Sequence, residues 1–358
     1  MAATINLSAL TFSADQLRQM NELLVAAVLE APTLSLFHDI ATGIKNDREI
    51  GIVPGTLGLM GKAAQGCNPS ADTTLGATAA LKTWEPRRIE VIIDQCATDI
   101  ASTMAKLARK LGVAVNDLTN TEYFAFLLDL LSKDIPKMIL RHAWMGNQSA
   151  ADVNASPAGV LTAGVDADYF NIINGFFYQL AVIYGVTPAR KTSISANAQA
   201  TTALQFSQFT AAAALAALNS VIDDAKPVLG LQPDRVLIVT HSVFQKAYRA
   251  LQAAGYVYQD IKLQSNGFSL LTWDGIPMYS VPLWDEWIAA YENNGTKLNS
   301  PHRIVYTTKS NLVIGMEGTT LFDNVNSFYD PKSRYNRIEV SDAFDAKVLN
   351  DELVQVGI

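Results

Sequence analysis

The pair His241-Ser242 is the strongest candidate for chemistry in this sequence. It directly follows residues 235–240, a continuous apolar run typical of a buried strand, where an α/β enzyme could carry a catalytic pair. A hydroxyl beside an imidazole can serve as nucleophile and base. Ser242 is also the natural N-cap of a helix expected over residues 242–254, because a serine oxygen can accept a hydrogen bond from a first-turn amide. We expect the cap, with an α/β hydrolase using Ser242 and His241 as the weaker alternative.

Other reactive residues lack the spacing of a known site. The four histidines have no ligand spacing, the acid pairs are typical of solvated faces, and the glycines spaced by three do not stand between a strand and a helix. These residues are His38, His142, His241 and His302; Asp223-Asp224 and Asp285-Glu286; and Gly55, Gly58 and Gly61. No G-x-S-x-G, G-x-G-x-x-G, P-loop, H-E-x-x-H or C-x-x-C motif occurs. We therefore expect no catalytic, cofactor-binding or metal-binding residue, and a protein that is not an enzyme.

A group of aromatic residues leaves two alternatives open. The group consists of Trp273, Tyr279, Trp284 and Trp287. Such residues can line a pocket or an interface, and they can equally form part of a core.

Composition limits the class of protein. The chain of 358 residues is long enough for a large core and two domains. Only 17% of the residues are charged and 49% are hydrophobic, so much of the surface must be apolar or small. The net charge is -7 without a block of Lys and Arg, which argues against tight binding of nucleic acid. A nucleic acid partner would be held by enclosure rather than by affinity.

Other composition features point to a soluble protein in a reducing compartment. The longest apolar run, residues 211–218, is far shorter than a membrane span, and we expect no secretory signal. The two cysteines, Cys67 and Cys96, are expected to be free thiols.

Residues 119–147 predict the element around which the chain is organised. Thr119 and Glu122 form a capping box, and apolar residues recur at helical spacing up to a stop at Gly146-Asn147. Pro136 predicts a kink. A helix of this length, apolar on more than one side, is expected to support other elements or other subunits.

The remaining pattern predicts mixed α and β structure. We expect helices over residues 13–30, 97–111 and 207–226, and a hairpin over 270–281 with its turn at Asp274-Gly275. We also expect a strand over 84–94, successive antiparallel strands over 303–307, 311–315 and 319–328, and a further strand over 334–349. Residues 43–83 are rich in glycine and lack core residues, so they are either disordered or an extended hairpin ordered from outside. Residues 148–164 are rich in Ala, Ser, Gly and Pro, and we expect them to be a linker to a second domain.

This order of elements resembles the major capsid proteins of tailed bacteriophages. The matching residues are Trp144 to Asn147 at the helix end, Asp274 to Pro277, and Thr307 to Gly315. The resemblance implies an α+β, HK97-like capsid fold. Its parts would be an N-terminal arm (1–42), an extended β-hairpin loop (43–83), a peripheral domain (84–164 and 300–358) with a spine helix (120–145), and an inserted axial domain (165–299).

The resemblance also implies a function and partners. The chain would assemble with itself into hexamers and pentamers of an icosahedral virion shell that encloses double-stranded DNA without sequence-specific binding. Portal, scaffolding and decoration proteins would be partners, a membrane would not, and assembly would take place in the host cytoplasm. The closest alternative is the shell of an encapsulin-like nanocompartment of the same fold.

Overall fold

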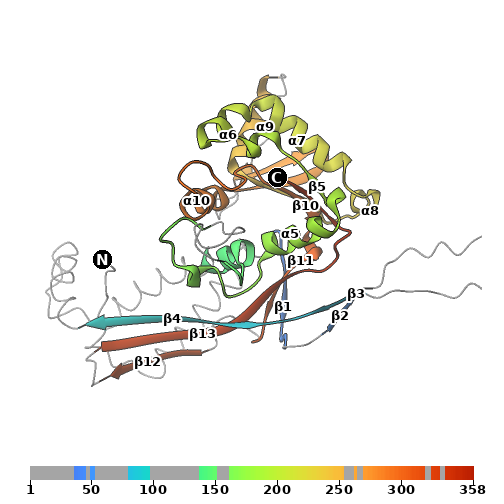
Figure 1. The fold of residues 1–358 in the computed structure, drawn as a ribbon. Coiled ribbons are helices and arrows are strands. Elements are labelled where there is room, and N and C mark those ends of the chain that lie inside the picture. Colours follow the sequence, from blue (N-terminus) through green and yellow to red (C-terminus); the bar gives the residue numbers. More distant parts are fainter. Residues whose placement is uncertain are drawn as a thin grey trace, which may run out of the picture.

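The computed structural model describes residues 36–45, 49–52, 80–96, 137–150, 161–253, 262–263, 269–318, 324–330 and 335–358. These residues form a mixed α+β structure, as expected. Figure 1 shows two regions: a sheet with helices near the C-terminus, and long strands that extend away from it. The helices expected over 13–30 and 97–111 and the kink at Pro136 lie outside the described residues.

A mixed sheet of seven strands forms the first region. Its spatial order is β5 (Lys191–Thr192), β14 (Val354–Gly357), β10 (Ile304–Thr308), β6 (Arg235–Thr240), β9 (Ile276–Val281), β8 (Ser269–Trp273) and β7 (Lys262–Leu263). Strand β6 is predicted correctly to the residue. Its continuous apolar run is explained by burial on both faces, with Val236 and Ile238 in one core and Leu237 and Val239 in the other.

Helices cover both faces of this sheet. They are α5 (Phe176–Val186), α6 (Thr202–Gln208), α7 (Ala211–Asp223), α8 (Pro227–Gly230), α9 (His241–Ala253) and α10 (Pro282–Tyr291). Helices α5 and α10 contribute to the core that contains Val236, whereas α7 and α9 contribute to the core that contains Leu237. The turn between β8 and β9 has positive φ at Asp274 (49°) and Gly275 (72°), which confirms the predicted hairpin.

A second sheet of five strands forms the extended region. It contains β1 (Asp39–Thr42), β11 (Leu312–Met316), β13 (Tyr335–Val348), β12 (Asn324–Asp330) and β4 (Arg87–Cys96). Strand β13 is central, because β4 pairs along one side of it while β12 and then β11 pair along the other. Gln179 of α5 continues this ladder past the end of β4: its side chain donates to the Ala346 carbonyl and accepts from the Val348 amide.

The chain crosses between the two sheets at two neighbouring places. Strands β10 and β11 are joined through residues 309–311, and β13 and β14 through residues 349–353. Asn311 ties the two connections together, because its Nδ2 donates to the Asn350 carbonyl (3.0 Å) and its Oδ1 accepts from the Asn350 amide (2.6 Å).

These crossings correct one prediction. Residues 303–307 and 311–315 were expected to be successive antiparallel strands, but they lie in different sheets. Strand β10 pairs with β6 and β14, whereas β11 pairs with β1 and β13. The strands after residue 299 are therefore divided between the sheets. Both strands are buried and β-forming, so their local pattern could not reveal the partners of each.

A second correction concerns the helix expected over residues 207–226. The structure has α6 and α7 instead, separated at Phe209 and Thr210. Thr210 has extended backbone angles, and its hydroxyl accepts a hydrogen bond from the Ala213 amide. This side-chain cap begins a new helix at Ala211.

The end of the long helix is also different from expectation. Residues 137–145 are helical, and residues 119–136 lie outside the described part. Gly146 does not adopt the expected left-handed conformation, because it is absent from the described residues with positive φ. Glycine is needed at this position because two backbone carbonyls approach it closely. A Cβ there would lie 2.4 Å from the His142 carbonyl oxygen and 2.7 Å from that of Ile173. The segment before α5 thus packs directly on the helix end.

Candidate functional site

His241 and Ser242 do not form the predicted pair. Both ring nitrogens of His241 have other partners, since Nδ1 lies 3.1 Å from Ser280 Oγ and Nε2 accepts from the Gln245 amide. The hydroxyl of Ser242 instead lies 2.9 Å from Nδ1 of His302. The sequence placed His302 in a separate segment, and only the folded sheet brings it next to Ser242.

The expected cap role of Ser242 is also wrong. Helix α9 begins at His241, and the amides of His241 and Ser242 donate to the two oxygens of Asp285, at 2.6 and 3.1 Å. Asp285 belongs to the first turn of α10. The Asp285 side chain of α10 therefore caps α9. Local sequence rules do not detect a cap that comes from a different helix.

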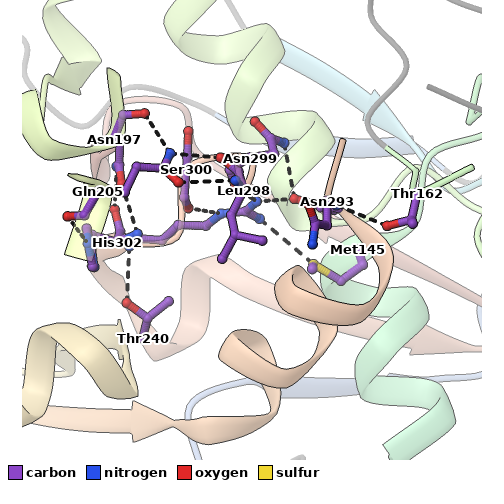
Figure 2. A network of polar contacts seen from close by, with 12 residues as sticks. Met145, Thr162, Asn197, Gln205, Thr240, Asn293, Leu298, Asn299, Ser300 and His302 are labelled. Atoms are coloured by element: carbon purple, nitrogen blue, oxygen red, sulfur yellow. Dashed lines mark hydrogen bonds and ion pairs between the residues drawn. The ribbon is translucent and has the colours of Figure 1, made fainter. Parts of the chain in front are cut away.

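Ser242 bonds to His302. His302 in turn belongs to a polar network that joins three segments (Figure 2). The amide side chain of Asn197 pairs with the backbone of His302 in both directions, at 2.7 and 3.0 Å. Gln205 bonds in the same way to the backbone of Leu298, and its own carbonyl lies 3.2 Å from His302 Nε2. The network closes the loop before β10 against α6 and the start of α9.

The proton positions in this network follow from its acceptors. His302 Nε2 faces a carbonyl and must donate, so Nδ1 accepts from the Ser242 hydroxyl. Burial lowers the pKa of His302 from 6.5 to about 4, although the Gln205 carbonyl opposes this and the charge of Lys246 adds to it. The ring stacks on Phe209 with centroids 3.8 Å apart. His302 is thus a neutral, fully packed imidazole at pH 7.

The arrangement resembles a nucleophile and base in distance alone. Acyl transfer also needs N–H donors directed at the developing oxyanion. The two amides next to the hydroxyl, those of His241 and Ser242, are already used by the Asp285 carboxylate. Because His302 has no exposed surface, its ring is also closed to an external substrate. The geometry fits a structural network rather than a catalytic site.

A cavity of about 360 Å³ lies beside this network, at the junction of the helix end, α5 and the C-terminal strand. Its polar wall contains Arg303 and Glu292, which form a buried ion pair. The Arg303 guanidinium also donates to the Asn299 carbonyl and lies 4.4 Å from the centre of the Phe177 ring. Because Glu292 neutralises Arg303, the pair offers no net charge for a charged ligand.

The other sequence candidates are dispersed. Trp284 and Trp287 are buried in one core and Trp273 in the other, so the aromatic group does not line a common pocket. Asp223 is exposed, and Asp224 accepts from the Thr192 hydroxyl. Within the described ranges, no three His, Cys, Asp or Glu side chains are grouped as metal ligands. The described helices are also too short or too polar to cross a membrane.

The ends of the glycine-rich segment 43–83 meet at one place. Strand β2 (Glu49–Ile52) pairs antiparallel with β3 (Ala80–Thr83), and β3 leads into β4 (Figure 1). Ile44 and Trp84, at the two ends, pack together with Val313 of β11. We call these three residues, with Gly315, the hairpin root.

Gly315 is required for this packing. A Cβ there would lie 2.7 Å from Cζ3 of Trp84 and 2.8 Å from Cδ1 of Ile44. A glycine inside a strand is a signal of such close approach, and Gly315 is the last residue of one motif that carried the capsid resemblance. Its contact with Trp84 was not foreseen, because the two residues are far apart in sequence.

No protein-family model and no curated protein matches this chain. Solved structures are similar to it. The procapsid of satellite phage P4, which includes the size determination protein, has a TM-score of 0.45 and 11% identity, with 96% of this chain and 97% of that chain covered. The SrpI encapsulin of Synechococcus elongatus PCC 7942 has a TM-score of 0.48 and 11% identity, with 97% and 95% covered. The capsid of cyanophage P-SCSP1u has a TM-score of 0.43 and 12% identity, with 90% and 86% covered.

Proposed function

We propose that this chain is a structural subunit that assembles with itself into a closed icosahedral shell. The shell would consist of hexamers and pentamers and would enclose packaged double-stranded DNA as a virion capsid. The observation that carries the proposal is the paired hairpin root: residues 53–79 separate two strands that pair with one another and end on the same cluster.

The length of the segment is the reason. Loops longer than about 12 to 15 residues are uncommon in compact domains unless they have a function of their own. A segment spanning residues 53–79 could reach at most roughly 45 Å from its paired ends. That reach is enough to contact a neighbouring subunit, and the firm packing of the root would direct it there.

Surface composition supports the same proposal. Helix α5 leaves Val182 and Val186 exposed, at 51% and 80%, and Leu231 after α8 is 82% exposed. Together with the low charged fraction, such residues fit a subunit whose surface is covered in an assembly. The net charge of -7 suits a wall that encloses DNA without binding its phosphates tightly.

The proposed organisation has five segments. They are an N-terminal arm (1–42), an extended loop (43–83), a peripheral domain (84–164 and 300–358) with its spine helix (120–145), and an inserted axial domain (165–299). Strands β10 and β14 fall within the residue range of the proposed peripheral domain, but they pair within the seven-stranded sheet and would complete the axial domain. Portal, scaffolding and decoration proteins are the proposed partners, and the host cytoplasm is the proposed site of assembly.

A shortened hairpin tests the function. Replacing residues 53–79 with a two-residue Asn-Gly turn should close β2 onto β3 and leave the fold intact. The purified wild type should form regular shells in negative-stain micrographs, whereas the shortened variant should remain as soluble subunits with an unchanged melting temperature. A variant with a Gly/Ser segment of the original length controls for chain length alone.

The content of the shells separates the two kinds of container. Nucleic acid in shells isolated from the natural source would support a capsid, and protein cargo would support a nanocompartment. A wild type that forms no closed assembly, or a shortened variant that still forms normal shells, would contradict the proposal.

A further inference from the structure

The corner between β3 and β4 is held to the body by polar contacts as well as by the hairpin root. Residues 84–86 are not part of either strand, so the chain could change direction there. Trp84 is buried in the root, and polar contacts are made by the residues on both sides of it.

The first contact fixes the backbone after Trp84. The Glu85 amide donates to one oxygen of Asp345 at 2.8 Å, while the other oxygen accepts from the Ala346 amide at 2.8 Å. Lys347 Nζ lies 3.3 Å from the same carboxylate. Asp345 is a buried acid of β13, so a strand in the middle of the sheet determines the position of this corner.

The second contact fixes the chain before Trp84. Lys82 Nζ donates to the Val348 carbonyl at 2.7 Å and forms an ion pair with Asp351. These partners lie at the end of β13 and in the connection that follows it. Since Lys82 belongs to β3, this contact connects the hairpin itself to the body.

The exposure of the Lys82 contact indicates that its role differs from core stabilisation. The side chains of Lys82 and Asp351 are 24% and 54% exposed, and ion pairs of this kind contribute little to folding. Their position matters more, because β3 directly follows residues 53–79. A small rotation of β3 at the root would change the direction in which the chain leaves the body.

We propose that Lys82 and Asp345 are positioning residues that set the direction in which the 43–83 segment leaves the body. They would thereby determine whether the segment meets a second copy of this chain. This inference rests on the proposed shell function. It assigns the control of assembly geometry to two residues within one subunit, neither of which needs to touch the neighbour.

Substitutions at Lys82 test the proposal with a matched control. Lys82→Met removes the ion pair and the bond to the Val348 carbonyl, Lys82→Arg can restore both, and Asp345→Asn removes the charge beside Glu85. The control is Lys226→Met, because Lys226 forms an ion pair with Glu352, which lies next to Asp351 in the same connection, and Lys226 is not part of the hairpin. All variants would be compared for thermal melting, yield of shells and shell diameter.

We expect Lys82→Met and Asp345→Asn to melt as folded subunits but to give at least a tenfold lower yield of regular shells, or shells of altered diameter. Lys82→Arg and Lys226→Met should assemble as the wild type does. Normal shells from Lys82→Met would overturn the inference while leaving the shell function intact. A wild type without shells would instead overturn the function and, with it, this inference.

Hydrogen exchange of unassembled subunits distinguishes positioning from direct contact. If the contacts hold the corner, the amides of residues 80–85 should exchange faster in Lys82→Met and Asp345→Asn than in the wild type or Lys226→Met. Lost assembly with unchanged exchange would mean that Lys82 acts at the interface itself, which would also overturn the inference.

Discussion

The Ser242 hydroxyl donates to Nδ1 of His302 over 2.9 Å, across 60 residues of sequence. The contact joins the start of α9 to a residue two positions before β10, and His302 in turn donates to the Gln205 carbonyl. The imidazole thus connects the first turn of α9 to α6. Its position in a buried, satisfied network decides its role, because a catalytic base must be reachable by substrate.

Ser242 should not react as an enzymatic nucleophile. A fluorophosphonate probe at neutral pH should leave the mass of the intact protein unchanged, because the amides nearest the hydroxyl donate to Asp285. Stoichiometric labelling that disappears in Ser242→Ala would show that a catalytic serine had been misread.

Asp285, which lies in α10, should stabilise the start of α9 more than any side chain in the first turn of α9 does. Asp285→Ala leaves two amides without their acceptor and should lower the free energy of unfolding by about 1 to 2 kcal/mol. Glu286→Ala, at the exposed neighbouring position, should change it by less than about 0.5 kcal/mol. Urea unfolding of both variants would measure the difference, and equal effects would contradict the cap.

His302 should make folding sensitive to acid. Its pKa is about 4 in the folded chain and ordinarily 6.5, so the stability from the neutral ring is complete above pH 6.5 and is lost as pH falls toward 4. The total loss should be roughly 3 kcal/mol. The free energy of unfolding should therefore decrease more between pH 7 and pH 4 for the wild type than for His302→Gln. His241→Gln, at a partly exposed ring, is the control, and parallel curves for His302→Gln and the wild type would refute the assignment.

Two glycines should respond in opposite directions to alanine. Gly146→Ala places a methyl group against two backbone carbonyls and should cost about 1 to 3 kcal/mol or more, because backbone cannot move aside easily. Gly185 in α5 has open space around its Cβ position, so Gly185→Ala should stabilise by about 0.5 to 1 kcal/mol. Thermal melts would compare them, and a tolerated Gly146→Ala would mean that the helix end and the segment before α5 pack less closely.

Local signals predicted the elements that depend on local chemistry. The apolar run of β6, the Asp274-Gly275 turn and the long strand over residues 334–349 were all found, because their determinants lie within each segment. The break at Thr210 was missed, although threonine is a frequent cap, because the alanine-rich pattern around it continues through. An apolar pattern that continues through a cap residue does not show that one helix ends and another begins there.

The missing information was mainly about partners. Strands β10 and β11 were located within one residue, yet each belongs to a different sheet, and pairing depends on residues that are distant in sequence. The same limit hid the contact of Ser242 with His302 and the capping of α9 by Asp285. The sequence left residues 43–83 open between disorder and an extended hairpin, and the pairing of β2 with β3 favours the hairpin at the ends of the segment.

The two tied connections between the sheets have a mechanical consequence. Residues 309–311 and 349–353 run side by side, and Asn311 joins them, so the long strands and the helix-covered sheet are linked by two coupled connections. Two connections oppose twisting of one sheet against the other more strongly than one connection does. The two sheets also share one hydrophobic core, in which Phe344 and Ile314 of the second sheet pack with Ile238 of the first. A pull on β13 would therefore reach the other sheet through both connections and through this core at once, so the two sheets should resist separation.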